Sequence, residues 1–151
     1  MTFTDLKKAL NSGDFKPVYL LHGDESFFID KIVDLFENKV IDESLRSFNQ
    51  LVLYGKEVDH LTVIDTARRY PMMSDKQLVI LKEAQEMRSL KDLHVYMDNP
   101  MPSTVFVIAH KHNQAWSIFG LVGHLVTRRA DKIGWWQQCW ELHRMVLWVQ
   151  K

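Results

Sequence analysis

Four short apolar runs recur along the first two-thirds of the chain and predict β-strands. They occupy residues 17–22, 47–54, 77–82 and 104–109. Most of these residues are apolar without interruption, which is typical of strands covered on both faces of a sheet. Gly, Pro or polar residues flank each run, as expected where a strand gives way to a turn.

Between these runs, apolar residues recur at intervals of three and four, the spacing of a helix that packs one face on a core. This spacing predicts helices over residues 3–10, 25–40, 57–70 and 90–97. Strands and helices therefore alternate, and parallel strands joined by helices form one sheet. We predict an α/β fold, with a mostly parallel sheet of about four to five strands and helices on both faces.

Composition divides the chain into two parts of different character. Residues 1–111 carry 14 Lys or Arg and 17 Asp or Glu, whereas residues 112–151 carry five and two. The second part also contains the single cysteine and every tryptophan: Trp116, Trp135, Trp136, Cys139, Trp140 and Trp148. We therefore expect one domain over 1–111 and a divergent, Trp-rich tail over 112–151, which either completes that domain or trails it.

Two explanations of the tail remain open. The first is a helix over residues 135–150. Its shared face would carry Trp136, Trp140, His143 and Leu147. The second is a shifted reading frame or a truncated gene, which would explain the abrupt change of composition near residue 112.

Charge, hydropathy and cysteine content exclude several classes of protein. The chain balances 19 basic against 19 acidic side chains, and its mean hydropathy is −0.20. It lacks the run of about 18 apolar residues that a membrane helix requires, so no membrane association is expected. One cysteine excludes a disulfide framework and a Cys-based zinc site. Because the first residues show no signal-peptide pattern, we expect a cytoplasmic protein.

The loop after the first strand is where parallel α/β sheets bind ligands, so its residues bear on any nucleotide site. Gly23 is followed there by Asp24 and Glu25, and neither G-x-x-x-x-G-K-[ST] nor G-x-G-x-x-G is present. Two carboxylates repel phosphate and suit the positive end of a helix dipole instead. We interpret this segment as a degenerate phosphate-loop position and expect no cofactor.

Other candidate chemistry is sparse. His110 and His112 are two residues apart but lack a third ligand at a usual spacing, so we expect no metal site. The remaining acidic and histidine residues form no acid–base pair or nucleophile motif that the sequence alone supports. We therefore expect no catalytic residue.

The unusual feature is hydrophobic. Met72 and Met73 stand side by side after Pro71, in the polar connector that precedes the third strand. Neighbouring side chains on a turn point apart, so one buried position does not accommodate both. Flexible, polarisable thioethers suit a protruding plug that fills the pocket of another protein. The alternative is that one methionine covers the sheet edge and the other covers the helix.

Several strings of this sequence resemble the delta subunit of the bacterial DNA polymerase III clamp loader. They are PVYLLHGDE (17–25), FFID (27–30), LYGKE (53–57), ARRYPMMSDKQLVILKEAQ (67–85) and TVFVI (104–108). The order of predicted elements agrees as well, and the likeness runs from about residue 3 to residue 111. The resemblance implies an AAA+-like fold, related to the P-loop NTPases, without a functional phosphate loop.

In that family, a hydrophobic pair just before the third strand inserts into a pocket of the ring-shaped sliding clamp and helps to open the ring. The resemblance assigns clamp binding to Met72, Met73, Pro71, Ser74, Arg69 and Tyr70. The first two form the plug, the next two shape its turn, and the last two lie on the flanking helix end. The resemblance implies the sliding clamp (beta subunit) as partner, only indirect contact with DNA, and no catalysis by this chain itself.

The family also sets the limits of the likeness. Its members are more than twice as long and continue into a helical lid and a collar domain that joins the other clamp-loader subunits. Only 40 residues follow Lys111, and they do not resemble that part of the family. Two other functions stay open: a small nucleotide-binding α/β protein with an atypical phosphate loop, and a nucleic-acid-binding module that uses the basic, Trp-rich tail.

Overall fold

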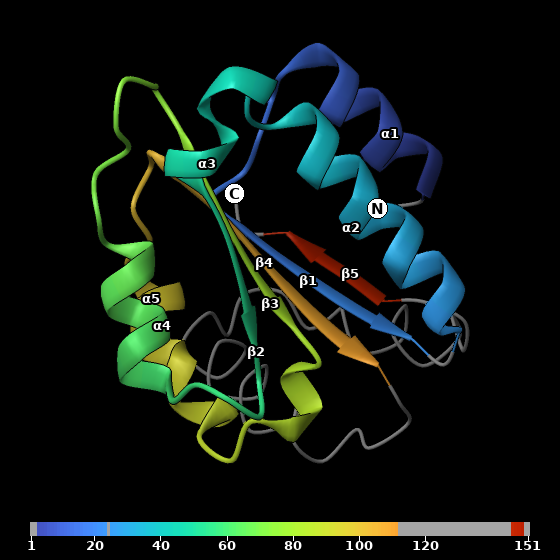
Figure 1. The fold of residues 1–151 in the computed structure, drawn as a ribbon. Coiled ribbons are helices and arrows are strands. Elements are labelled where there is room, and N and C mark those ends of the chain that lie inside the picture. The colour runs from blue at the N-terminus through green and yellow to red at the C-terminus, as the bar shows by residue number, and fades with distance from the viewer. Residues whose placement is uncertain (1–2, 24, 112–145, 150–151) are drawn as a thin grey trace.

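Strands and helices alternate along the chain in the order that the sequence predicts (Figure 1). The computed structural model describes residues 3–23, 25–111 and 146–149. The elements are α1 (Phe3–Ser12), β1 (Val18–Gly23), α2 (Ser26–Lys39), η1 (Glu43–Leu45), α3 (Arg46–Asn49), β2 (Gln50–Tyr54), α4 (His60–Ala67), β3 (Gln77–Lys82), η2 (Ala84–Glu86), η3 (Leu90–Leu93), α5 (His94–Asp98), β4 (Thr104–Lys111) and β5 (Val146–Val149).

Five strands form one sheet in the order β2-β3-β4-β1-β5. Strands β1 to β4 run parallel, whereas β5 pairs antiparallel with β1. The predicted sheet, mostly parallel with four to five strands, is therefore confirmed. Figure 1 shows the carboxyl ends of β1, β3 and β4 together on one side of the sheet, called the carboxyl edge below, and their amino ends on the opposite side, called the amino edge.

The tail helix predicted over 135–150 is wrong at residues 146–149, which form β5 instead. Strand β5 pairs with the side of β1 that β4 leaves free. Its sequence, Val-Leu-Trp-Val, suits a strand because it contains β-branched and aromatic residues. The rest of the predicted helix lies outside the described residues.

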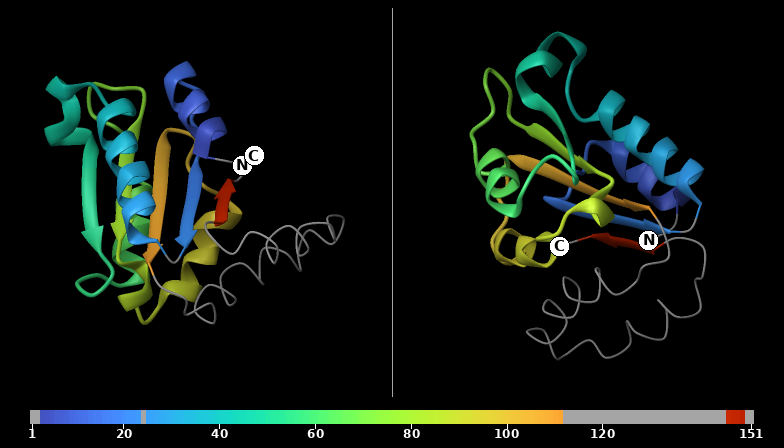
Figure 2. Two further views of the ribbon diagram at one scale, coloured as in Figure 1. Left: turned by 90° about the vertical axis from the view of Figure 1, so that its right-hand side faces the viewer. Right: turned by 60° about the horizontal axis from the view of Figure 1, so that its bottom comes forward.

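Both faces of the sheet are buried, because alternate residues of the central strands point to opposite sides. Helices α1 and α2 cover one face, and α4, η3 and α5 cover the other (Figure 2). The first core contains Leu6, Leu10, Tyr19, Leu21, Ile32, Phe36, Leu78, Ile80, Val105 and Val107. The second contains Leu20, Val63, Ala67, Val79, Leu81, Leu93, Tyr96, Met97, Phe106 and Ile108. The placement of helices on both faces is therefore confirmed.

Two predicted elements have different boundaries in the structure. The strand predicted over 47–54 begins only at Gln50, because residues 46–49 form the short helix α3. The buried side chain of Asn49 bonds to the carbonyl of Leu45 and to the backbone of Met72, and these contacts keep this segment out of the sheet. The sequence between 90 and 97 folds as a 3₁₀ turn followed by α5 rather than as one helix.

Helix α4 is also shorter than the predicted range 57–70. It begins at His60, after the N-cap Asp59, whose carboxylate accepts a hydrogen bond from the Thr62 N–H at 2.8 Å. It ends at Ala67, three residues before the predicted end. Pro71 has no N–H to continue the helix by bonding to the Ala67 carbonyl, which accepts hydrogen bonds from the Gln77 amide and the Thr104 hydroxyl instead. In the part of the chain that the structure describes, no helix is long and apolar enough to cross a membrane.

Candidate functional site

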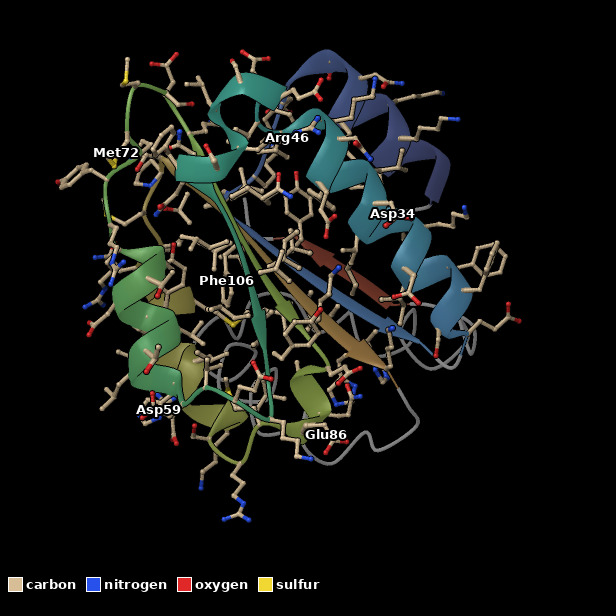
Figure 3. All side chains as sticks on the ribbon, in the orientation of Figure 1. Asp34, Arg46, Asp59, Met72, Glu86 and Phe106 are labelled. Atoms are coloured by element: carbon tan, nitrogen blue, oxygen red, sulfur yellow. The ribbon has the colours of Figure 1, made fainter. Side chains whose placement is uncertain are left out.

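Residues 68–76, called the methionine loop below, join the end of α4 to the start of β3. The loop lies at the amino edge of the sheet, and Figure 3 shows Met72 on it beside α3. Met73 is 89% exposed and Met72 is 60% exposed. The alternative in which the two methionines cover the sheet edge and the helix therefore disagrees with the structure, since both side chains face solvent.

The four flanking candidates take different positions on this loop. Tyr70 is 79% exposed and Arg69 is also exposed. Both lie beyond the end of α4, so their placement on the helix end is corrected to the start of the loop. Pro71 and Ser74 are half-buried, and the Ser74 hydroxyl accepts a long hydrogen bond of 3.4 Å from the Lys76 N–H. The loop therefore exposes its apolar and aromatic side chains while Pro71 and Ser74 lie against the body.

Buried polar side chains that the sequence did not single out hold this loop in place. Asn49 bonds to the backbone of Met72, and the Gln77 amide donates to the carbonyl of Arg69 at 2.6 Å and to the Thr104 hydroxyl at 2.8 Å. The sequence pattern marks Gln77 and Thr104, because each is a polar residue directly before a run of apolar strand residues. The pattern does not mark Asn49, because its partner is 23 positions away in the sequence.

The degenerate phosphate-loop position lies at the opposite edge of the sheet, where β1 ends. Gly23 is the last residue of β1, is buried, and is paired in register with Lys111 of β4. Glu25 occupies the N-cap of α2 without a capping hydrogen bond from its side chain. Asp24 lies outside the described residues.

At this carboxyl edge, two lysines are paired with carboxylates of α2. Lys111 Nζ lies 2.7 Å from Asp30 Oδ1, and Lys82 Nζ lies 2.9 Å from Glu37 Oε1. Partial burial lowers the pKa of Lys82, but the hydrogen bond and attraction from Glu37 raise it by more, so the pKa lies above its ordinary value. A phosphate group would have to compete with these carboxylates for both lysines.

Two histidines at the same edge contact each other directly. The Nδ1 atoms of His22 and His110 lie 3.2 Å apart, so one donates and the other accepts a hydrogen bond. His110 is fully buried, and His112, the other histidine of the predicted pair, lies outside the described residues. Among residues 3–23, 25–111 and 146–149, no group of three His, Cys, Asp or Glu side chains is arranged to hold a metal ion.

The two edges of the sheet therefore offer different chemistry. At the amino edge, exposed thioethers stand on a loop whose backbone is hydrogen-bonded to the buried side chains of Asn49 and Gln77. This arrangement suits insertion into an apolar pocket. At the carboxyl edge, Lys82 and Lys111 are each paired with a carboxylate of α2. Protein contact at the methionine loop agrees better with this geometry than phosphate binding after β1.

Comparison with known proteins decides the family. The family model described as "DNA polymerase III, delta subunit" matches residues 19–120, more than half of the chain. The chain belongs to the DNA polymerase III delta subunit family. The resemblance seen in the sequence is thereby confirmed, and the family is that of a subunit of a DNA polymerase complex.

Individual relatives agree with this family. The DNA polymerase III subunit delta of Bacillus subtilis (strain 168) is 31% identical over an alignment of 115 residues, and the match covers 69% of this chain and 33% of the relative. The solved structure of the Bacillus subtilis DNA clamp loader delta protein matches with a TM-score of 0.66 and 27% identity, over 75% of this chain and 37% of that chain. This chain thus spans about a third of the length of the curated relative.

A second solved structure supports the fold alone. A DNA polymerase III, gamma subunit-related protein from Thermotoga maritima matches with a TM-score of 0.57 at 13% identity, over 74% of this chain and 40% of that chain. The fold that this chain shares with both neighbours confirms the AAA+-like fold class implied by the resemblance.

Proposed function

We propose that this chain is the clamp-binding part of a delta-type clamp loader subunit. In this proposal, Met72 and Met73 insert into an apolar pocket of the sliding clamp and help to open the ring for loading on primed DNA during replication. The observation that carries the proposal is the exposure of two adjacent methionines on an anchored loop, in a chain of the delta family. The remaining candidate residues, Arg69, Tyr70, Pro71 and Ser74, flank or shape that plug.

The energy available from this plug is sufficient for an anchor but not for a whole interface. Burying a Met side chain contributes about 1.5–3 kcal/mol. A pair of such residues acts as a central hot spot, and the surrounding surface supplies contacts that exclude water. The rigid α/β body therefore serves as the platform that presents the loop.

Ring opening follows from a difference in affinity and requires no covalent chemistry. If the open clamp binds the plug more tightly than the closed clamp, binding shifts the clamp toward its open state by that difference. The chain needs no catalytic residue for this role. ATP-dependent steps, further clamp-loader subunits and DNA would act on it through the rest of the loader, in the cytoplasm.

The test is a calorimetric titration of the 151-residue chain into the sliding clamp of the same organism. A Met72→Ser/Met73→Ser variant removes the plug, and a Phe27→Ser/Phe28→Ser variant is the matched control. Phe27 and Phe28 are also adjacent and exposed, at 65% and 45%, but they lie on α2 at the carboxyl edge.

We expect the methionine variant to lose binding while it keeps its circular dichroism spectrum and melting temperature, and the phenylalanine variant to bind as the unchanged chain does. Equal binding by the methionine variant and the unchanged chain would remove the plug from the proposal. Absence of binding by the folded, unchanged chain would overturn the proposed function altogether.

A further inference from the structure

Asn49 is a buried polar residue that bonds directly to the backbone of the methionine loop. Its Oδ1 accepts a hydrogen bond from the Met72 N–H at 2.6 Å, and its Nδ2 donates to the Met72 carbonyl at 2.8 Å. Nδ2 also donates to the Leu45 carbonyl at 3.2 Å. Because a backbone N–H only donates and a carbonyl only accepts, both ends of the amide are assigned without ambiguity. The side chain thus pairs with Met72 as a neighbouring strand would.

The topology explains why these two residues meet. Strands β2 and β3 are parallel neighbours, with Gln50 paired in register with Leu78. The segment before β2 and the segment before β3 therefore arrive at the same edge of the sheet. Helix α3 ends directly before β2 and places Asn49 under the loop, where its side chain is 1% exposed.

The loop depends on such an anchor because its own side chains supply little packing. Met72 and Met73 are mostly in solvent, and Met73 adopts a left-handed backbone with φ of 55°. Residues other than Gly enter this region at a cost, so surrounding contacts must hold them there. Asn49 fixes the backbone one residue before Met73, and Gln77 fixes it at Arg69 near the other end.

We propose that Asn49 is a positioning residue for the methionine plug. It does not touch the partner; it holds the Met72 backbone so that both methionines are presented in the conformation that binds. This inference rests on the proposed function. A loop that is already ordered in its binding conformation binds more tightly, because binding no longer has to supply the entropy cost of ordering it. If the loop adopts that conformation for only a fraction of the time, the apparent affinity falls by the same fraction.

Two variants test this role against a merely structural one. Asn49→Ala removes all three hydrogen bonds, and Asn49→Ser keeps a hydroxyl that can bond within the α3 turn but is too short to pair with both groups of Met72. The matched control is Gln85→Ala at the carboxyl edge of the sheet. It removes one hydrogen bond of 3.0 Å, which the Lys111 N–H donates to the side-chain oxygen of Gln85. All variants are first compared by thermal melting.

Association and dissociation rates of the sliding clamp on the immobilised 151-residue chain then separate the outcomes. We expect Asn49→Ala and Asn49→Ser to bind about tenfold more weakly, chiefly through slower association, and Gln85→Ala to bind within about twofold of the unchanged chain. Amide hydrogen exchange at Met72 should accelerate in the Asn49 variants alone.

The results that would overturn the inference are distinct from those that concern the function. If the unchanged chain binds and a folded Asn49 variant binds equally well, Asn49 has no positioning role. A weaker complex that arises only from faster dissociation would also contradict positioning. If the unchanged, folded chain does not bind the clamp at all, the proposed function fails and this inference fails with it.

Discussion

The carboxyl edge and the amino edge of the sheet differ in how their side chains are used. At the carboxyl edge, where α/β folds ordinarily bind ligands, Lys82 and Lys111 are each paired with a carboxylate of α2. At the amino edge, two methionines project from a loop whose backbone is held by buried amides. The two edges therefore differ in what they present: ion pairs within the fold at one, and exposed apolar side chains at the other.

The difference also separates stability from binding. Contacts at the carboxyl edge are internal, so substitutions there should change the free energy of unfolding and leave partner binding alone. The methionines contribute little internal packing, so their substitution should change binding and leave stability alone.

Replacing Met73 by Gly should weaken clamp binding strongly and leave the free energy of unfolding almost unchanged. Gly adopts the left-handed backbone of this position without steric cost, but its greater freedom in the unfolded chain offsets that gain. We expect the free energy of unfolding to stay within about 1 kcal/mol of the original value. Loss of the thioether should weaken clamp binding by about 10- to 100-fold, since each tenfold corresponds to about 1.4 kcal/mol.

The control for this variant is Met73→Leu, which keeps an apolar side chain of similar volume. Urea unfolding measures stability and calorimetric titration measures binding. Clamp affinity that survives Met73→Gly, or a large loss of stability in that variant, would show that the side chain belongs to the fold rather than to the interface.

At the other edge, Glu37→Gln should lower stability without changing clamp binding. The pair with Lys82 is about a quarter exposed on each side, so we expect a loss of about 0.5–1 kcal/mol in urea unfolding near neutral pH. The pKa of Lys82 is raised above 10.5 in the fold. The pair therefore stabilises the fold from neutral pH up to about pH 10.5, and this contribution is lost as the pH rises through the higher pKa of Lys82 in the folded state.

The difference between the original chain and Glu37→Gln should accordingly vanish in strongly alkaline solution. A difference that stays constant with pH would mean that the ion pair is not its source. Reduced clamp binding by this variant would contradict the separation of the two edges.

The smallest expected effect is that of added nucleotide on the melting temperature. A ligand in a hundredfold excess over its dissociation constant stabilises a fold by about 2.7 kcal/mol. We expect millimolar ATP or ADP with Mg²⁺ to leave the melting temperature unchanged, because the phosphate-loop position lacks the lysine of a phosphate loop and Lys82 and Lys111 are each paired with a carboxylate. A clear rise in the melting temperature would favour a nucleotide-binding function instead.

Most of the sheet could be predicted because its strands are apolar on both faces. The third predicted strand, residues 77–82, coincides with β3. The polar connector alone left the exposure of Met72 and Met73 open, and the family resemblance favoured the exposed plug. The tail was harder, because the four residues of β5 form a strand only through pairing with β1, which lies more than a hundred positions earlier. A local helical pattern at 135–150 contains no information about that partner.

The anchors of the methionine loop could be predicted only in part, for the same reason. Gln77 interrupts the apolar pattern at the start of β3, which is a visible signal, and its amide bonds to the loop backbone. Asn49 lies in a segment that reads as a strand, and its role depends on the meeting of two segments at one sheet edge. Periodicity along the chain does not reveal such a meeting, whereas the parallel pairing of β2 and β3 does.

The central claim is that the methionine loop itself enters the partner. The most direct measurement uses the 151-residue chain with ¹³C-labelled methionine methyl groups, observed by NMR as the sliding clamp is added. We predict that the Met72 and Met73 signals shift or broaden, whereas those of Met87 and Met97, buried in the core beside α5, do not change position. Binding that leaves the Met72 and Met73 signals unaltered would contradict insertion of the methionine loop into the clamp.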